Sequence, residues 1–472
     1  MGAGYQPCAG GAGAQMTASL AADSAGPSLP FQCGHDGLLH HFFKDTQPMN
    51  FDIPPEIAAL RERTRQFIAE QVIPLESDPR HGAHGPSEEL RRELVARARA
   101  AGLLTPHASV EMGGLGLSHI AKAVVFEEAG YSNLGPTALN IHAPDEGNIH
   151  LMEEVATPAQ KERWLRPQVA GLTRSCFAMT EPEPGAGADP SMLKTTAVRD
   201  GKDYLINGRK WFITGAAHPR CQLLIVMCRN GNAAEQAAHQ QHSMVLVPLN
   251  TPGVQVVRNI PVVHHRAPEG HCEIVFRQVR VPKDHLLGAW GQGFAMAQAR
   301  LGTGRVHHCM RTIGQCELAL ELSSERALER SAFGKHLSDQ SNVQDWLAES
   351  RLEIDQARLL VLKTAWMLDF GQAPASELRA QVSAIKVVAA RLQTRVVDRA
   401  MQVFGAMGLS PDTPLAYFWT WGRAMHLMDG PDEVHLRTVA RHELQKARQR
   451  MGQTAAYFTT PEQMCAQPHL SA

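Results

Sequence analysis

The chain has 472 residues, of which 44% are hydrophobic and 20% are charged, and its formal net charge at pH 7 is −1. This length exceeds that of one hydrophobic core and predicts about three domains in a globular protein. The near-neutral charge argues against a general affinity for nucleic acid or anionic membranes, and no apolar run approaches the roughly 20 residues of a bilayer span. We therefore expect a soluble protein.

The nine cysteines are scattered, odd in number and without a CxxC pair. This pattern favours free thiols in a reducing compartment, so we expect a cytoplasmic location. Adjacent histidines occur at 40–41, 264–265 and 307–308. Neighbouring side chains point in different directions on a helix or a strand, and no HExxH or clustered Cys/His spacing accompanies them, so no metal site is predicted.

The N-terminal third is predicted to be an extension followed by helices. Residues 1–48 are rich in Gly, Ala, Ser and Pro and lack the charged start and apolar core of a signal peptide, which predicts a disordered extension. A helical domain is expected at 49–173, because apolar residues from Ile57 to Val72 recur at helical spacing. Further helices are expected at 87–101, 118–130 and 158–170.

A β domain is predicted at 174–288. In "DYLINGRKWFIT" (203–214), Asn207-Gly208 stands between two strand-like runs and predicts a β-hairpin. The runs "QLLIVM", "SMVLVP", "VQVV" and "CEIVF" follow, separated by turn residues, and predict mainly antiparallel strands that end near Pro282.

Long helices are predicted at 289–450, with a tail at 451–472. Apolar residues repeat every seven positions with small residues between them, which indicates a bundle seam. The repeat consists of Leu347, Ile354, Val361 and Leu368, and the small residues are Ser350, Ala357 and Ala365. Helices, then strands, then helices predict an α+β chain with segregated layers.

Four glycine-containing stretches could bind a ligand or could be ordinary turns. "MGGLGLS" (112–118) follows no predicted strand, so a turn before a helix is favoured over a phosphate loop. In "CFAMTEPEPGAGADP", Thr180 sits where a strand enters a loop that would let a planar ligand approach the backbone. "ERSAFGKHL" (329–337) is a basic helix break that could hold a pyrophosphate, and "QVFGAMG" (402–408) is typical of a helix end.

The stretch "MHLMDGPDEVHLR" (425–437) gathers Asp429, Asp432 and Glu433 around Gly430 and Pro431. Asp-Gly favours a turn, and an acidic residue after Pro431 suits the N-terminus of the following helix. The same carboxylates could instead remove a proton from a substrate. Local features alone favour the capped turn.

Taken together, these stretches resemble the acyl-CoA dehydrogenase family over about residues 50–450. The motifs that match in order and spacing are "GLGLSHIAKAVVFEEAGYS", "TPAQKERWLRPQVAG", "FAMTEP", "INGRKWFITGA", "RSAFGKHL" and "QVFGAMG". Three further stretches are most similar to a branch whose larger members carry a fused kinase-like domain, of which we expect none in these 472 residues. Those stretches are "APDEGN", "GRVHHCMR" and "DGPDEVH".

The resemblance implies a helical domain, a central β-barrel-like domain and a C-terminal four-helix bundle, with FAD between them and a homodimer or homotetramer. The residues implied to line the isoalloxazine are Phe177, Met179, Thr180, Phe212 and Thr214. The residues implied to reach the FAD of a neighbouring subunit are Arg330, Phe333, Gln402 and Gly405. The family usually has Trp at the position of Phe212, which should still pack against the flavin.

The resemblance also implies a reaction and a base. Family enzymes remove the α proton of an acyl-CoA thioester and pass a β hydride to flavin N5, which gives a 2-enoyl-CoA. The usual Glu-Gly pair is Asp429-Gly430 here, so Asp429 is the implied base, with its backbone N–H as a donor to the thioester carbonyl. Some members carry the base on the first helix of the C-terminal domain, at the position of Gly304. Arg305 is expected to orient the turn.

Further positions follow from the same resemblance. Glu433, with Pro431, lies where family residues face FAD, and Glu433 is the second choice as base. Ala188, Arg305 and Gly430 are implied substrate contacts, and an electron-transfer flavoprotein is the implied acceptor. Ala188 replaces a frequent Ser in a loop two residues longer than the commonest form.

Two alternatives remain open. Aspartate is one methylene shorter than glutamate, so its carboxylate would sit about 1.5 Å further back unless the backbone moves in. An Asp base also occurs in the related nitroalkane oxidases, which makes that chemistry an alternative. The second alternative is a non-catalytic scaffold with the same fold, against which the set of Thr180, Arg330, Phe333 and Asp429 counts.

Overall fold

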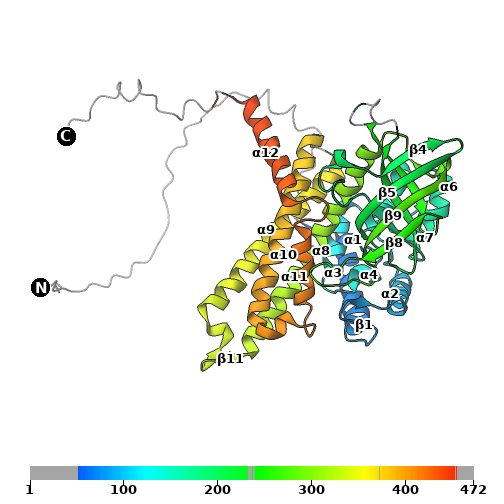
Figure 1. Cartoon of the computed structure of the whole chain (residues 1–472). Coiled ribbons are helices and arrows are strands. Elements are labelled where there is room, and N and C mark those ends of the chain that lie inside the picture. Colours follow the sequence, from blue (N-terminus) through cyan, green and yellow to red (C-terminus); the bar gives the residue numbers. More distant parts are fainter. Residues whose placement is uncertain (1–51, 232–236, 238–239, 372, 452, 454–472) are drawn as a thin grey trace, which may run out of the picture. The chain divides into compact units, whose positions relative to one another are not determined.

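The computed structural model describes residues 52–231, 237, 240–371, 373–451 and 453. The predicted extension at 1–48 and most of the predicted tail at 451–472 lie outside the described residues. Within the described part, helices, a β-sheet and further helices follow one another in that order, as Figure 1 shows. None of the helices in these segments combines the length and apolarity needed to cross a bilayer.

The first helices begin at capped positions that the sequence marks. Ser87 accepts a hydrogen bond from the backbone N–H of Leu90, and Ser118 accepts one from that of Ala121, so two helices begin directly after a serine. The helices are α1 (Pro55–Phe67), α2 (Glu88–Ala100), α3 (His119–Gly130), α4 (Gly135–Ala138), α5 (Asp145–Val155), α6 (Pro158–Gln160) and α7 (Arg166–Val169). π-Helical turns at Ile68–Val72 and Lys161–Leu165, a 3-10 turn at Ile73–Leu75 and a small hairpin of β1 (His81–Gly82) and β2 (Gly85–Pro86) complete this part. The helices expected at 87–101 and 118–130 are confirmed.

The middle of the chain forms an eight-stranded sheet in the order β10-β7-β6-β4-β5-β9-β8, with β3 paired to β6. The strands are β3 (Arg174–Ala178), β4 (Thr196–Asp200), β5 (Asp203–Thr214), β6 (Cys221–Asn230), β7 (His242–Pro248), β8 (Val254–Asn259), β9 (His271–Pro282) and β10 (Leu286–Leu287). Only the pairs β3–β6 and β4–β6 are parallel among the described strands. Single 3-10 turns occur at Pro190–Met192 and Lys283–His285.

The hairpin predicted at Asn207-Gly208 is wrong. β5 runs straight through these residues, with a register shift against β9 between Ile206 and Gly208. β9 pairs with both halves of β5 and β4 pairs with its first half, so the halves do not pair with each other. The tight turn lies before β5, at Gly201. A Cβ at Gly208 would lie 2.4 Å from Oγ1 of Thr195, so this glycine permits a close approach of backbone rather than a turn.

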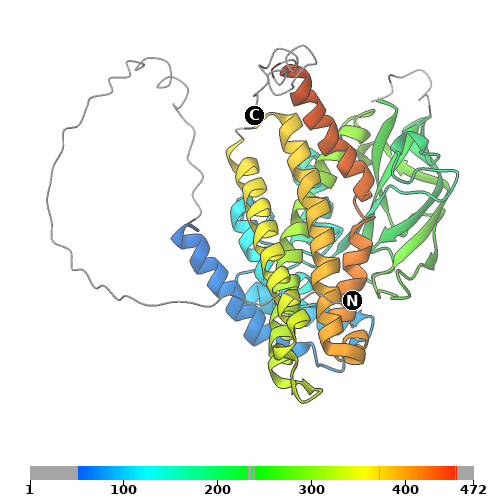
Figure 2. The same ribbon diagram turned by 90° about the vertical axis from the view of Figure 1, so that its left-hand side faces the viewer.

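The C-terminal part consists of long helices that run alongside one another (Figure 2). They are α8 (Gly293–Glu329), α9 (Ser341–Phe370), α10 (Ala375–Phe404), α11 (Leu415–Met425) and α12 (Asp432–Gln449). A small hairpin of β11 (Ser331–Ala332) and β12 (Lys335–His336) joins α8 to α9, and 3-10 turns occur at Leu337–Asp339 and Gly405–Leu409. The predicted seam of α9 is buried from Ser350 to Ala365.

Helix α8 connects the N-terminal helices to the bundle. One core cluster combines Phe126 of α3, Val306 and Met310 of α8, and Ile385 of α10. α3 and α8 approach so closely that a Cβ at Gly314 would lie 1.9 Å from the carbonyl oxygen of Glu127. This contact fixes the face of α8 that carries the candidate site.

Candidate functional site

The candidate site is built on the turn between α11 and α12. Asp429 and Gly430 have φ angles of +52° and +103°, in the left-handed region that a non-glycine residue rarely adopts. The backbone N–H of Asp432 donates to the carbonyl oxygen of His426 and closes the turn at 3.0 Å. Such a conformation persists only where surrounding contacts hold it.

Two side chains hold this turn through one carbonyl oxygen. Nε of Arg305 donates to the carbonyl oxygen of Asp429 at 2.9 Å, and Nε2 of His435 lies 3.2 Å from the same oxygen. Burial, followed by the charge of Arg305, lowers the pKa of His435 to about 4, so His435 is neutral at pH 7. A Cβ at Gly430 would lie 3.1 Å from Nε2 of His435, so a side chain there would crowd that ring as well as strain the backbone.

A buried ion pair fastens the start of α12. The carboxylate of Asp432 accepts from Nζ of Lys386 at 2.9 Å and lies 2.6 Å from Nδ1 of His426. Burial opposes ionisation of Asp432, but the hydrogen bonds from Lys386 and His426 outweigh it and hold the pKa of Asp432 below its usual value. Asp432 is therefore a structural carboxylate, as its position in the first turn of a helix suggests.

The carboxylate of Asp429 points toward α8. Oδ2 lies 3.3 Å from Nε2 of His308 and Oδ1 lies 3.6 Å from Nη1 of Arg300, while the side chain is 16% exposed. Burial raises the pKa of Asp429, but the hydrogen bond from His308 and the charges of Arg300 and Arg305 outweigh it and place this pKa well below its usual value. Asp429 is therefore ionised at neutral pH.

Gly304, the alternative position for a base, lies beside the carboxylate of Asp429. A Cβ at Gly304 would be 3.6 Å from Oδ2 of Asp429 and 3.9 Å from Nη1 of Arg300. The two chain positions at which the resemblance implies a base, 304 and 429, therefore lie next to each other. Because residue 304 is glycine, these two positions hold a single carboxylate, that of Asp429.

The residues predicted to face the isoalloxazine come together on two strands of the sheet. Phe177, Met179 and Thr180 lie at or just beyond the end of β3, while Phe212 and Thr214 lie on β5. Oγ1 of Thr180 donates to the carbonyl oxygen of Trp211 at 2.8 Å, and the N–H of Trp211 donates back to the carbonyl oxygen of Thr180 at 3.1 Å. This pair of bonds joins the two segments.

A bulge in β5 presents Phe212 outward. The pairing of β5 with β9 shifts register between Lys210 and Ile213, and Phe212 has a φ of +52° with 44% of its surface exposed. An exposed aromatic ring beside the half-buried Thr180 suits a planar ligand, so these residues fit an isoalloxazine. Phe177 joins the two halves of the site, because the guanidinium of Arg300 lies 4.6 Å from the centre of its ring.

A second group of predicted residues lies at the hairpin end of the bundle, marked by the label β11 in Figure 1. Arg330 and Phe333 belong to the segment that joins α8 to α9, and Phe333 is fully exposed with a φ of +53°. Gln402 and Gly405 are exposed at the end of α10, whose Phe404 lies under the guanidinium of Arg326 on α8. No contact among the described residues joins this group to Asp429 within one chain.

The remaining predicted residues lie near the turn or on the loop after β3. Glu433 is exposed in the first turn of α12, where a cavity of about 450 Å³ is also lined by Arg395, Arg423 and Trp419. Pro431 is the N-terminal boundary residue of α12, and Ala188 is exposed on its loop. Glu433 therefore opens toward a different space from the carboxylate of Asp429.

The sequence reasoning assigned no role to several charged and polar residues around Asp429. They are Arg300, His308 and Arg311 on α8 and Asp145, Glu146 and Asn148 on α5. All of them except Arg300 belong to "GRVHHCMR" (304–311) and "APDEGN" (143–148), two stretches that resemble a branch of the family. The spacing of residues 300, 304, 308 and 311 along one helical face is the signal that could have identified them.

Fold and site together define a three-part α+β protein, in which a nearly buried carboxylate on the helical bundle lies near aromatic residues at the ends of β3 and β5. Three family models match the chain: the acyl-CoA dehydrogenase N-terminal domain at residues 54–172, the middle domain at 176–279 and the C-terminal domain at 291–444. The chain belongs to the acyl-CoA dehydrogenase family, whose members are FAD-dependent oxidoreductases.

Two curated relatives differ in length. FadE2 of Mycobacterium tuberculosis, described as a probable acyl-CoA dehydrogenase, is 48% identical over 405 residues, covering 84% of this chain and 98% of that protein. Human acyl-CoA dehydrogenase family member 11 is 43% identical over 339 residues, covering 71% of this chain but only 43% of that protein. The chain thus spans less than half of this longer relative, in agreement with the predicted branch.

Solved structures share the fold. An acyl-CoA dehydrogenase homologue from Mycobacterium abscessus is 41% identical with a TM-score of 0.78, and the match covers 84% of this chain and all of that one. Butyryl-CoA dehydrogenase of Megasphaera elsdenii is 25% identical with a TM-score of 0.72, with 84% and 100% covered. The predicted fold class and family are confirmed.

Proposed function

We propose that this chain is an FAD-dependent acyl-CoA dehydrogenase in which Asp429 removes the α proton of an acyl-CoA thioester, giving a 2-enoyl-CoA. The single observation that carries the proposal is the environment of Asp429, a nearly buried carboxylate held ionised by Arg300 and His308. A general base must be ionised and fixed close to the carbon that it deprotonates. Asp429 is ionised and its carboxylate is held by contacts on both oxygens, without a second carboxylate at position 304.

The turn that carries the base also offers a donor for the thioester carbonyl. The backbone N–H of Asp429 has no acceptor among the residues that the structure describes. A donor aimed at a developing negative charge stabilises the enolate-like transition state. Arg305 and His435 hold the carbonyl oxygen of Asp429 and thereby fix the direction of the adjacent backbone.

The residues on β3 and β5 would hold the cofactor. Phe177, Met179, Thr180, Phe212 and Thr214 would line the isoalloxazine, which when bound supplies the acceptor for the β hydride. Thr180 and Phe212 lie at the ends of the adjacent segments β3 and β5, and the bulge at Phe212 keeps its ring turned outward. Pro431 and Glu433 would lie nearby at the start of α12.

We further propose that the protein is a homodimer or homotetramer in which a second subunit completes the cofactor site. Arg330, Phe333, Gln402 and Gly405 lie at the hairpin end of the bundle, away from Asp429, and would reach the FAD of the neighbouring subunit. The full exposure of Phe333 supports an intermolecular contact for this hairpin.

Substrate contacts, the electron acceptor, the location and the domain boundaries follow from the same proposal. Ala188 and Gly430 would contact the substrate, an electron-transfer flavoprotein would accept the electrons, and the protein would act in the cytoplasm. The domains would divide at residues 49–173, 174–288 and 289–450. Three family-model matches in this order support the division into three domains, and the free, buried cysteines of the described residues support a reducing compartment.

Anaerobic bleaching of the flavin tests the proposal. Purified holoprotein should lose its visible flavin absorbance on mixing with at least one acyl-CoA from a panel of short, long and branched acyl groups, and should keep it on mixing with nitroethane. Bleaching by nitroethane alone would favour the nitroalkane-oxidase alternative. Protein that binds no FAD would favour the scaffold.

A further inference from the structure

One face of α8 carries the groups that meet the carboxylate of Asp429. Arg300, Gly304, His308 and Arg311 follow one another at intervals of four, four and three residues, which places them on one side of the helix. Gly304 leaves the space that the carboxylate occupies, and Arg300 and His308 stand on either side of it. Arg311 lies one turn beyond His308.

Arg311 fixes the tautomer of His308. Nη2 of Arg311 lies 2.8 Å from Nδ1 of His308, and a guanidinium can only donate, so Nδ1 must accept and carries no proton. The ring proton therefore sits on Nε2, which faces Oδ2 of Asp429 at 3.3 Å. Arg311 is itself held by the carbonyl oxygen of Ile141 at 2.5 Å and by Oε1 of Glu146 at 3.5 Å.

Arg300 is held equally firmly on the other side. Its Nε donates to Oδ1 of Asn148 at 3.2 Å and its Nη2 to the carbonyl oxygen of Pro144 at 3.1 Å. Asn148 in turn donates to Oγ of Ser175 at 2.9 Å. These bonds leave Nη1 of Arg300 directed at Asp429 and prevent the buried side chain from turning away.

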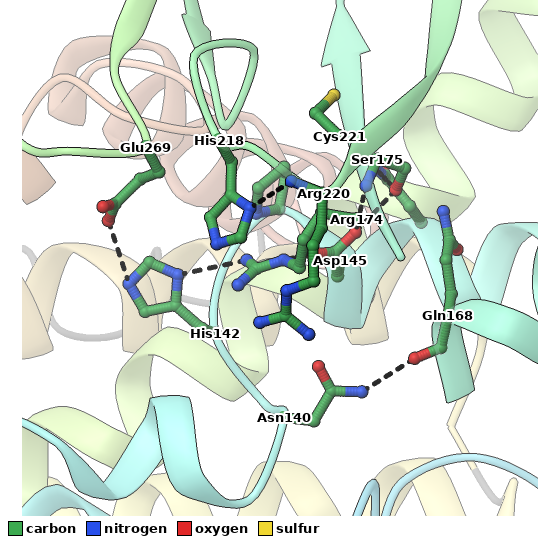
Figure 3. A network of polar contacts seen from close by, with 12 residues as sticks. Asn140, His142, Asp145, Gln168, Arg174, Ser175, His218, Arg220, Cys221 and Glu269 are labelled. Atoms are coloured by element: carbon green, nitrogen blue, oxygen red, sulfur yellow. Dashed lines mark hydrogen bonds and ion pairs between the residues drawn. The ribbon is translucent and has the colours of Figure 1, made fainter. Parts of the chain in front are cut away.

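The anchor continues into a buried polar network that Figure 3 shows. The carboxylate of Asp145 accepts from the backbone N–H and the Oγ of Ser175, both at 2.7 Å, and pairs with Arg174. His142 lies between Arg174, at 3.5 Å, and Glu269, at 3.7 Å. The network fixes α5 to the start of β3 and therefore fixes Asn148 and Arg300.

We propose that His308 and Arg300 are positioning residues that hold the carboxylate of Asp429 in a single orientation, and that Arg311, Glu146 and Asn148 hold these two in turn. The role presupposes the proposed function, because it is the reaction base that is being positioned. Such fixing matters because a misplacement of about 1 Å can cost a hundredfold in rate.

Other titratable groups also lie close to Asp429. They are Arg305 on α8, the neutral His435 on α12 and Lys386 on α10. Arg305 and His435 bind the backbone carbonyl oxygen, and Lys386 pairs with Asp432. Substitutions at His308 and Arg300 therefore address the carboxylate itself.

The pH dependence of flavin reduction tests the role. His308→Leu removes the donor, so Asp429 should ionise only at higher pH, and the acid limb of kcat/KM should move up by about one pH unit. His308→Gln, which keeps an N–H donor, should move the acid limb less than His308→Leu does. Arg300→Met, which removes the charge, should move the acid limb further than Arg300→Lys does. His150→Gln is the matched control, because His150 on α5 pairs with Glu154 at the surface and should leave the limb unchanged.

A lower rate with an unmoved acid limb in both His308→Leu and Arg300→Met would overturn the proposal. A thermal measurement separates this failure from failure of the proposed function. The Tm shifts of His308→Leu and Asp429→Asn should not add in the double variant, because the two residues are in contact. Additive shifts would overturn the contact even if no acyl-CoA reduces the flavin. If the Tm shifts are non-additive but no acyl-CoA reduces the flavin, the contact between His308 and Asp429 stands and the proposed function is refuted.

Discussion

Arg305 and Asp429 are 124 residues apart in sequence, yet Nε of Arg305 donates to the carbonyl oxygen of Asp429 at 2.9 Å. The bond joins the middle of the first bundle helix to the turn before the last one. It stabilises a left-handed aspartate that would otherwise relax. Orientation of the base thus depends on how α8 packs against the turn.

Substitution of Arg305 should therefore impair the reaction more than cofactor binding. In Arg305→Gln we expect kcat to fall by about ten- to a hundredfold with FAD content unchanged, because the base is displaced by a fraction of an ångström. Arg305→Lys, which restores a charged donor, should recover part of the loss. Wild-type kcat in Arg305→Gln, measured with the acyl-CoA that bleaches the wild type, would show that the bond has no role in orientation.

Arg330 should matter for cofactor retention. Arg330→Ala removes a cation from the hairpin proposed to reach the FAD of a neighbouring subunit, so the FAD-to-protein ratio after gel filtration should fall several-fold. Arg92→Ala is a suitable control, because Arg92 is exposed on α2 and pairs with Glu88. Unchanged FAD content in Arg330→Ala would refute its placement at the cofactor.

The Asp432–Lys386 pair predicts a pH-dependent loss of stability. The folded-state pKa of Asp432 is depressed, so its contribution is present above the unfolded pKa and is lost as pH falls through the folded pKa. Asp432→Asn also leaves the buried Lys386 unpaired, so urea unfolding at pH 7 should show a loss of about 3 kcal/mol. The difference from wild type should shrink toward pH 3.5. A constant difference at both pH values would contradict the ion-pair assignment.

Substitution by alanine at two glycines of α8 should change the free energy of unfolding in opposite directions. Gly314→Ala places a methyl group 1.9 Å from the carbonyl oxygen of Glu127 and must push α3 and α8 apart, which should cost about 2 kcal/mol. A Cβ at Gly302 meets nothing within 4 Å, so Gly302→Ala should stabilise the helix by about 0.5–1 kcal/mol. Unfolding free energies measure both, and equal effects would contradict the close contact of α3 and α8.

Local signals in the sequence predict much of this fold. Ser87 and Ser118 mark helix starts, and the spacing of Ile354 and Val361 marks the buried side of α9, because capping and amphipathic burial are decided within a few residues. The Asn207-Gly208 hairpin fails for the opposite reason. Whether such a pair turns or continues depends on which strands lie beside it, and here β9 pairs with β5 on both sides of Asn207-Gly208.

The site is predictable only in part. Asp429 and Arg305 follow from motif resemblance, but the role of Arg300 does not, because its partners Pro144 and Asn148 lie more than 150 residues earlier in the chain. Such contacts arise from the packing of α5 against α8. The sequence shows that residues 300, 304, 308 and 311 share one face of a helix. Only the packed structure shows that this face lies against Asp429.

Rapid anaerobic mixing of Asp429→Asn holoprotein with the acyl-CoA that reduces the wild type tests the central claim most directly. Asparagine keeps the shape of the side chain and removes the base, so FAD should stay bound while the rate constant of flavin reduction falls by at least about a thousandfold. Glu433→Gln, measured alongside, should reduce at close to the wild-type rate. Reduction of Asp429→Asn at the wild-type rate, with loss of reduction in Glu433→Gln, would contradict the assignment and make Glu433 the base.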